Sequence, residues 1–465
     1  MSEIAYDLDT WFPVLRGGDA PRQLFDAQDP RAASQAEEAG AALPKGGRLV
    51  VRSAGTQASR VDARALESRL ESNGHVERFL EFPGPSGSEL LLPTTDAAAF
   101  RGGMAVLPRG RARNRTVWTL LRAASPFVLA QGLGRPEISV WTKGPSLRET
   151  EDLPALPVDG SLAVTTGDRE RSRPTVVRAL DRRGAARAVL KIGLSERTDD
   201  GVAREARALV HLADLAPDRA PRLLAEGERA GRTWLAQEVL EGRHAGEAFG
   251  HGHADFLAEL AASTRDAALL EDCGFWTDAR RHLATLDPLE DPDWHAEYHR
   301  LAEALERSAD DRPIPTALAH GDYAPWNLVI RKGTVRAHDW GHLTEDAPAL
   351  HDVLHFHVQA GVIAKDQPGE RVYEDLDRLF AGPAQRVVSA LELERDDVLR
   401  LAALYVLHEG TTAEIVRRKR DSSGADAARL RHALRALCRR LAGLLGERTL
   451  PAWTRTDRSD PREAA

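Results

Sequence analysis

The chain has 465 residues, of which 42% are hydrophobic and 29% are charged, a composition typical of a globular protein with two or three domains. Its formal net charge of -8 argues against nucleic acid as the main partner, because phosphate-binding proteins usually carry a basic face. The sequence contains no apolar run of about 18 residues and begins without the pattern of a secretion signal, so we expect no membrane span. Its two cysteines form no CxxC pair, which predicts a reducing, cytoplasmic location.

The first 150 residues predict a small α/β module. Strand patterns cover residues 48–54, 75–84 and 89–93, and a helical pattern covers residues 61–74. This order resembles the last part of a class I methyltransferase. The glycine-rich cofactor loop of that class is missing, and too few residues precede Leu43 to build the cofactor half. We therefore expect residues 1–150 to lack a methyltransferase cofactor site.

The pattern changes after residues 142–160, which are rich in proline and acidic residues and predict a domain boundary. Strand patterns then cover residues 161–167, 174–181, 186–194 and 232–242, with one helical pattern at residues 201–215. Helical periods dominate from residue 254 onward. We therefore predict three domains: residues 1–150, a β-rich lobe at residues 151–242, and a helical lobe at residues 243–465.

One segment of the helical lobe, HGDYAPWNLVIRKGTVRAHDWG at residues 320–341, combines several chemically useful side chains. Lys332-Gly333 predicts a two-residue hairpin turn, and pairing outward from it places Asn327 opposite His338 and beside Asp339. An amide oxygen and a carboxylate are the hard oxygen ligands that suit Mg²⁺. Asp322 lies on a turn just before the hairpin, close enough to act on a substrate hydroxyl beside that metal.

HGDYAPWN followed by HDWG resembles the aminoglycoside phosphotransferase and choline kinase-like family, over about residues 155–450. The resemblance implies an α+β bilobal protein-kinase-like fold, with a β-rich N-lobe and a helical C-lobe, here preceded by the small α/β module. It implies that Asp322 is the catalytic base and that Asn327 and Asp339 bind Mg²⁺. It also implies a loop-orienting role for His320 and a structural anchor at Asp352.

The β-rich lobe offers residues for ATP. A kinase-like site needs a lysine on the third strand and a glutamate on the next helix, and Lys191 and Glu205 occupy those places. The resemblance implies that backbone groups from Glu238 to Leu240 contact adenine, and that residues 165–174 cover the phosphates. That loop contains only one glycine and no GxGxxG motif, which departs from the protein-kinase pattern.

These features predict an ATP- and Mg²⁺-dependent phosphotransferase that acts on a hydroxyl of a small polar metabolite, such as an amino sugar, sugar or amino alcohol. Residues 241–360 contain 22 acidic and 10 basic residues, which would attract a cationic acceptor, although a solubilising surface is the simpler explanation. His351 and His355 have a spacing that can bind zinc, but no HExxH glutamate lies between them, so we expect packing or hydrogen bonds to substrate. A nucleotide-binding regulatory or scaffold protein is the alternative, and a methyltransferase-like enzyme is a third.

Overall fold

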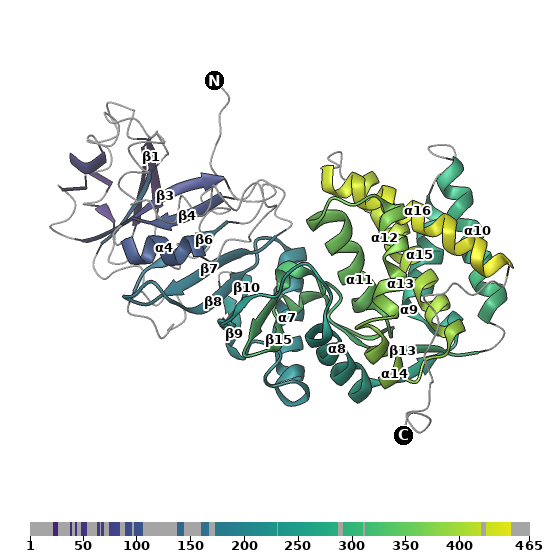
Figure 1. Cartoon of the computed structure of the whole chain (residues 1–465). Helices are drawn as coiled ribbons and strands as arrows, with labels where there is room; N and C mark the ends of the chain where they lie inside the picture. The colour runs from purple at the N-terminus through teal and green to yellow at the C-terminus, as the bar shows by residue number, and fades with distance from the viewer. Residues whose placement is uncertain are drawn as a thin grey trace. The chain divides into compact units, whose positions relative to one another are not determined.

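The structure is a computed structural model of the chain (Figure 1). The described residues are 22–26, 38–39, 42–43, 48–53, 63–65, 67–68, 74–83, 89–94, 97–105, 137–143, 160–166, 173–229, 231–286, 292–309, 312–419 and 425–447. The chain divides into two compact units. The first comprises Met1–Val210 and Pro221–Val239, and the second comprises His211–Ala220 and Leu240–Ala465.

A single large sheet dominates the first unit. Among the described residues its ten strands follow the order β1-β2-β5-β3-β4-β6-β7-β8-β10-β9, and the pairing of β1 with β2 is parallel, whereas the other pairings are antiparallel. The strands are β1 (Arg22–Asp26), β2 (Arg48–Ser53), β3 (Gly74–Pro83), β4 (Glu89–Pro93), β5 (Glu137–Lys143), β6 (Leu162–Thr165), β7 (Thr175–Leu180), β8 (Ala186–Ile192), β9 (Leu223–Arg229) and β10 (Arg232–Glu238).

The predicted N-terminal module and the predicted N-lobe share this sheet, because β4 pairs with β6 through Leu90–Thr165 and Leu91–Val164. Alternate residues of the central strands point to opposite faces, and both faces are buried. One apolar cluster extends from Val50 on β2 to Ala236 on β10. The other lies under helix α4 (Ala97–Ala105), where Phe100 and Met104 pack with residues of β3, β4 and β6. The two predicted segments therefore have a common core.

Helix α4 also approaches the turn between β7 and β8 very closely. Gly184 in this turn has a φ of 77°, and a Cβ atom there would lie 2.1 Å from the carbonyl oxygen of Ala98. Glycine is required at this position both for its backbone conformation and for the space that it leaves.

Helix α7 (Glu196–Leu215) begins in the first unit and reaches into the second. Its buried face carries Val202, Ala206 and Leu209, at the spacing of one side of a helix. Glu205 is also buried on this helix. The apolar residues account for the packing of α7, whereas the buried carboxylate requires a partner.

Helices form most of the second unit. They are α8 (His251–Thr264), α9 (Gly274–Thr285), α10 (Pro292–Ala309), α11 (His351–Gln359), α12 (Gly369–Glu374), α13 (Leu376–Phe380), α14 (Gln385–Ala390), α15 (Arg395–Lys419) and α16 (Ala425–Glu447). Helix α16 packs against α10 and α15 (Figure 1). No helix among the described residues is both long and apolar enough to cross a membrane.

Two small sheets complete the second unit. The first orders its strands as β11 (Arg243–His244), β14 (Leu328–Arg331) and β15 (Thr334–Ala337), and the second as β12 (Asp266–Ala268), β13 (Ile314–Ala319) and β16 (Thr344–Pro348). Strands β13, β14 and β15 carry or flank the residues that the sequence singled out.

The predicted α+β fold, with a β-rich lobe before a helical lobe, is confirmed. Strands β2, β3, β4, β6, β7, β8 and β10 match strand predictions, and α7 matches a helix prediction but begins earlier, at Glu196. Strands β1, β5 and β9 and helix α4 were not predicted, nor were the short strands β11, β12, β13 and β16. Residues 137–141 of β5 are all buried, so both faces of this strand are covered.

Candidate active site

The β14–β15 hairpin has the predicted register. Leu328 pairs with Ala337, and the two turn residues Lys332 and Gly333 both have positive φ, 51° and 86°. Two consecutive residues of this kind form the turn whose twist matches that of a hairpin. Beyond the last pair, the backbone N–H of His338 donates to the carbonyl oxygen of Asn327 at 3.0 Å. The hairpin therefore brings Asn327 next to the residue that precedes Asp339.

Asp322 and Asn327 are in direct contact. The amide nitrogen of Asn327 donates both to Oδ2 of Asp322 and to the backbone carbonyl oxygen of Asp322, each at 2.9 Å. Asn327 is buried, whereas the side chain of Asp322 is 35% exposed. Because the amide nitrogen is held by Asp322, the amide oxygen of Asn327 is the atom left for a ligand.

Asp352 on α11 holds the loop that carries Asp322. Its two carboxylate oxygens accept the backbone N–H groups of His320 at 2.6 Å and of Gly321 at 3.1 Å. Gly321 has a φ of 79°, and a Cβ atom there would lie 2.1 Å from the carbonyl oxygen of His342. The loop therefore depends on a buried carboxylate below it and on a glycine within it.

His320 is fully buried and joins the loop to the end of the hairpin. Its Nε2 lies 2.9 Å from the carbonyl oxygen of His338, and its Nδ1 accepts the backbone N–H of Asp322 at 3.2 Å. A carbonyl oxygen can only accept, so Nε2 carries the proton and the ring is neutral. Burial agrees with this state, because it lowers the pKa of His320.

Asp339 follows the hairpin in a left-handed conformation, with φ 66° and ψ 55°, at the start of a short turn of helix. Its side chain is 48% exposed, with Oδ2 3.6 Å from Nδ1 of His338. The next residue, Trp340, is buried and donates from Nε1 to the carbonyl oxygen of Ala337 at 2.9 Å. This buried indole fixes the backbone beside Asp339, whose carboxylate is accessible from solvent.

The oxygen donors of this region fit Mg²⁺ chemically. Asn327 supplies an amide oxygen and Asp339 supplies a carboxylate, and Mg²⁺ usually takes only one or two protein carboxylates and completes its coordination with phosphate oxygens and water. Among the described residues no group of three or more histidine, cysteine or acidic side chains could hold a metal by itself.

Histidine and acidic side chains from α11 and α15 surround Asp322 and Asp352. Nε2 of His355 lies 3.2 Å from Oδ1 of Asp322, and His351 contacts Asp352 at 3.4 Å. Glu409 on α15 accepts from His408 at 3.1 Å and lies 3.7 Å from His351. The sequence pattern did not indicate Glu409, because its distance along the chain from the HGD segment hides the contact.

These contacts set the charges of the site. Burial raises the pKa of Asp322, but the hydrogen bond from His355 and the neighbouring imidazoles outweigh burial and leave it below its ordinary value. Burial likewise opposes the ionised form of Asp352, yet its pKa is lowered by its bond with His351 and by the backbone donors. Burial lowers the pKa of His351, but its bonds to Asp352 and Glu409 raise it to about 9. At neutral pH the two aspartates are ionised and His351 is charged.

In the first unit, Lys191 on β8 and Glu205 on α7 meet as the sequence suggested. Nζ of the buried Lys191 lies 2.7 and 2.6 Å from the two carboxylate oxygens of Glu205. The pair lies next to β10, where Leu235 is opposite Lys191. A buried lysine in this geometry is held in one direction by both oxygens of its partner.

The residues expected around adenine are at the end of β10 and just after it. Glu238 is opposite Ala188 of β8, and its backbone N–H already donates to the carbonyl oxygen of Arg222 at 2.9 Å. Leu240 follows and is half-buried. The middle of the predicted phosphate-covering loop, residues 167–172, lies outside the described residues.

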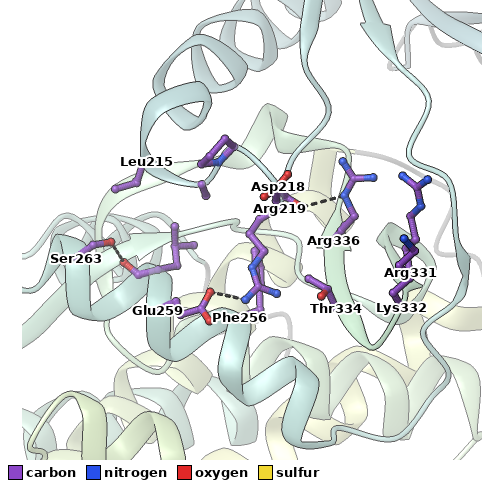
Figure 2. Close-up of a pocket in the computed structure, with 13 residues that line it drawn as sticks. Leu215, Asp218, Arg219, Phe256, Glu259, Ser263, Arg331, Lys332, Thr334 and Arg336 are labelled. Carbon is purple, nitrogen blue, oxygen red and sulfur yellow. Dashed lines mark hydrogen bonds and ion pairs between the residues drawn. The ribbon is translucent and has the colours of Figure 1, made fainter.

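A separate pocket of about 690 Å³ lies in the second unit between the last turn of α7, α8 and the hairpin (Figure 2). Arg219 crosses it, with its guanidinium 5.5 Å from the ring of Phe256 and an ion pair to Glu259. Arg336 donates from Nε to the carbonyl oxygen of Asp218 at 2.9 Å (Figure 2). The lining does not include the residues of the candidate active site.

Residues 166–357 match the model of the phosphotransferase enzyme family (APH). The match bears out the resemblance recognised from the sequence, over less than half of the chain. It spans Lys191, Glu205, Asp322, Asn327 and Asp339, and it bears out the prediction of an enzyme of the phosphotransferase class.

Several solved structures are similar to part of the chain. A thermostable mutant of aminoglycoside phosphotransferase APH(4)-Ia, in its apo form, is 18% identical, with 61% of this chain and 96% of that chain covered and a TM-score of 0.41. The GDP complex of a mutant aminoglycoside 2'-phosphotransferase-IIIa is 13% identical, with 62% and 91% covered and a TM-score of 0.40. APH(3'')-Id from Streptomyces rimosus is 18% identical, with 50% and 89% covered and a TM-score of 0.32. No curated protein matches the chain.

Proposed function

We propose that this protein is an ATP- and Mg²⁺-dependent phosphotransferase that transfers the γ-phosphate to a hydroxyl group of a small polar metabolite. The observation that carries the proposal is the contact between Asp322 and Asn327, on a loop that Asp352 anchors and at the start of a hairpin that leads to Asp339. A base, an amide oxygen and a second carboxylate in this order are the parts that phosphoryl transfer uses.

Asp322 acts on the acceptor. Its carboxylate is ionised and partly exposed, so it can accept the proton of a hydroxyl that attacks the phosphate. Asn327 and His355 each hold one of its oxygens, and each oxygen retains a lone pair for the acceptor. The loop therefore orients the acceptor hydroxyl as well as accepting its proton.

The remaining proposed roles concern the nucleotide. Asn327 and Asp339 would hold Mg²⁺, which neutralises charge on the phosphates when bound. Lys191 neutralises phosphate charge from the first unit and is directed by both oxygens of Glu205. Backbone groups from Glu238 to Leu240 contact adenine, and the N–H of Glu238 already donates to the carbonyl oxygen of Arg222.

The acceptor class in this proposal includes amino sugars, sugars and amino alcohols. The acidic excess of residues 241–360 favours those that carry an amino group. A cytoplasmic location is part of the same proposal. It is supported by the use of ATP and by Cys273 and Cys438, which are both buried and unpaired as a disulfide.

The test compares Asp322→Asn with the wild-type protein. Each protein is incubated with MgATP and one compound from a panel of amino sugars, sugars, amino alcohols and nucleosides, and ADP release is measured. ATP affinity is measured separately by calorimetry. We expect at least one compound to raise ADP release in the wild type. We expect Asp322→Asn to lower that turnover by about 10² or more at nearly unchanged ATP affinity, because the amide keeps the shape but cannot take the proton.

Asp346→Asn is the matched control, since Asp346 is exposed in the same unit. It should leave turnover unchanged. Wild-type turnover in Asp322→Asn would contradict the proposed mechanism. Saturable ATP binding without ADP release on any compound would favour a nucleotide-binding regulatory protein instead.

A further inference from the structure

His355 is the one side chain of α11 that the structure joins directly to Asp322. Its Nε2 lies 3.2 Å from Oδ1, while Asn327 donates to Oδ2 at 2.9 Å from the opposite side. Both oxygens of the carboxylate therefore have a donor. A carboxylate held at both oxygens cannot rotate about its Cβ–Cγ bond without breaking a hydrogen bond.

Two further contacts fix the His355 ring itself. The hydroxyl of Tyr405 on α15 lies 3.5 Å from Nδ1 of His355, and the ring of His351 stacks parallel to it, with centroids 5.6 Å apart and an interplanar angle of 14°. Tyr405 is buried, so the ring of His355 is enclosed on this side. The ionised carboxylate of Asp322 can only accept, so Nε2 of His355 carries the proton in their contact.

The position of His355 excludes direct contact with an acceptor. Its side chain is only 7% exposed, compared with 35% for Asp322. Its two nitrogens face Asp322 and Tyr405, so neither points into solvent. A role in the reaction must therefore act through Asp322.

We propose that His355 is a positioning residue that, together with Asn327, fixes the orientation of the Asp322 carboxylate toward the acceptor hydroxyl. The inference rests on the proposed function of Asp322 as the base. Tyr405 supports the role by packing edge-on against the His355 ring, with centroids 6.2 Å apart. Loss of the Nε2–H donor leaves Oδ1 of Asp322 without its partner and the carboxylate free to turn.

The test uses four variants of the full chain: His355→Phe, His355→Gln, Tyr405→Phe and His357→Gln. His355→Phe keeps a planar ring but removes the donor, and we expect a fall in kcat of about tenfold to a hundredfold, the scale of a hydrogen bond to a charged group. The KM for ATP should stay within about twofold. His355→Gln places an N–H near the position of Nε2 and should recover most of kcat, and Tyr405→Phe should cause a smaller fall.

His357→Gln is the matched control, the same exchange two residues further along α11. The Nε2 of His357 lies 2.8 Å from the carbonyl oxygen of Val372, away from Asp322. The His357→Gln variant should leave kcat unchanged. A fall in kcat as large in His357→Gln as in His355→Phe would assign the effect to the packing of α11 and overturn the proposal.

A double variant separates this proposal from the proposed function. In an Asp322→Asn background, His355→Phe should lower kcat by less than about twofold, because there is no carboxylate left to hold. If Asp322→Asn is inactive but His355→Phe has wild-type kcat, the positioning role is wrong and the base assignment stands. If Asp322→Asn itself retains full kcat, the proposed function fails.

A spectroscopic measurement covers the case in which His355→Phe does not fold. A long-range ¹H–¹⁵N spectrum of the histidine rings, assigned with His355→Gln, reports which nitrogen of His355 carries the proton. The proposal requires the Nε2–H tautomer in the wild-type protein. A neutral ring protonated at Nδ1 could not donate to Asp322, and that result would overturn the proposal without any assay of turnover.

Discussion

Changing Asp352 to asparagine should destabilise the loop that carries Asp322. In the wild type the carboxylate of Asp352 accepts two backbone N–H groups, from His320 and Gly321, and it also contacts His351. The amide has one acceptor oxygen, so one N–H must face an NH₂ group. Each hydrogen bond to a charged acceptor is worth about 1.5–3 kcal/mol. Breaking a buried ion pair by removing one partner costs about 3–5 kcal/mol.

Since Glu409 still contacts His351 in this variant, the charge of His351 retains one partner. The lower end of the range for a broken ion pair, about 3–5 kcal/mol, therefore applies. We expect Asp352→Asn to lower the free energy of unfolding of the second unit by about 3 kcal/mol. Asp352→Ala, which loses both acceptors, should lower it by about 5 kcal/mol. Urea unfolding followed by tryptophan fluorescence measures both values, since Trp340 is buried in this unit. Turnover should fall in both variants, because the loop positions Asp322.

Glu345→Gln is the control for Asp352→Asn. Glu345 is exposed on β16, and its exchange should change the free energy of unfolding by less than about 0.5 kcal/mol. If Asp352→Asn unfolded at the same urea concentration as Glu345→Gln and kept its turnover, the anchoring role of Asp352 would be refuted.

Two other predictions follow from buried charges. The pKa of His351 is raised to about 9 from 6.5. The stability that its charged form contributes is therefore complete below about pH 6.5 and is lost as the pH rises toward 9. The difference in melting temperature between the wild-type protein and His351→Gln should shrink over that range. Lys191→Met should weaken ATP binding measured by calorimetry. Because it removes one partner of a buried ion pair, it should also lower the free energy of unfolding by about 3–5 kcal/mol. Adding Glu205→Leu should restore much of that stability but not ATP binding, whereas recovery of ATP binding would contradict the role of Lys191.

The hairpin and the buried ion pair could be predicted because their signals are local or ordered along the chain. Lys332-Gly333 fixes the turn and therefore the register of every pair as far as Asn327. Lys191 and Glu205 follow from the order of strand and helix in a kinase-like lobe. The turn residues place the first pair, and the kinase-like order of elements places the second.

The contacts behind the loop could not be predicted in the same way. Tyr405 and Glu409 reach His355 and His351 only because α15 packs beside α11, and no periodicity encodes that choice of neighbours. The spacing of His351 and His355 favoured packing or hydrogen bonds to substrate over a zinc site. The structure places His351 beside Asp352 and Glu409, and His355 beside Asp322.

The pairing of β4 with β6 has a consequence for a shortened chain. Without β4, the backbone N–H and C=O groups along one side of β6 would have no partner, and an exposed strand edge of this kind recruits other chains. Ala163 and Leu180 would also lose the cover of Phe100. A chain shortened to begin at residue 151 would lack β4 and should therefore expose this edge of β6 and aggregate more readily than the full chain.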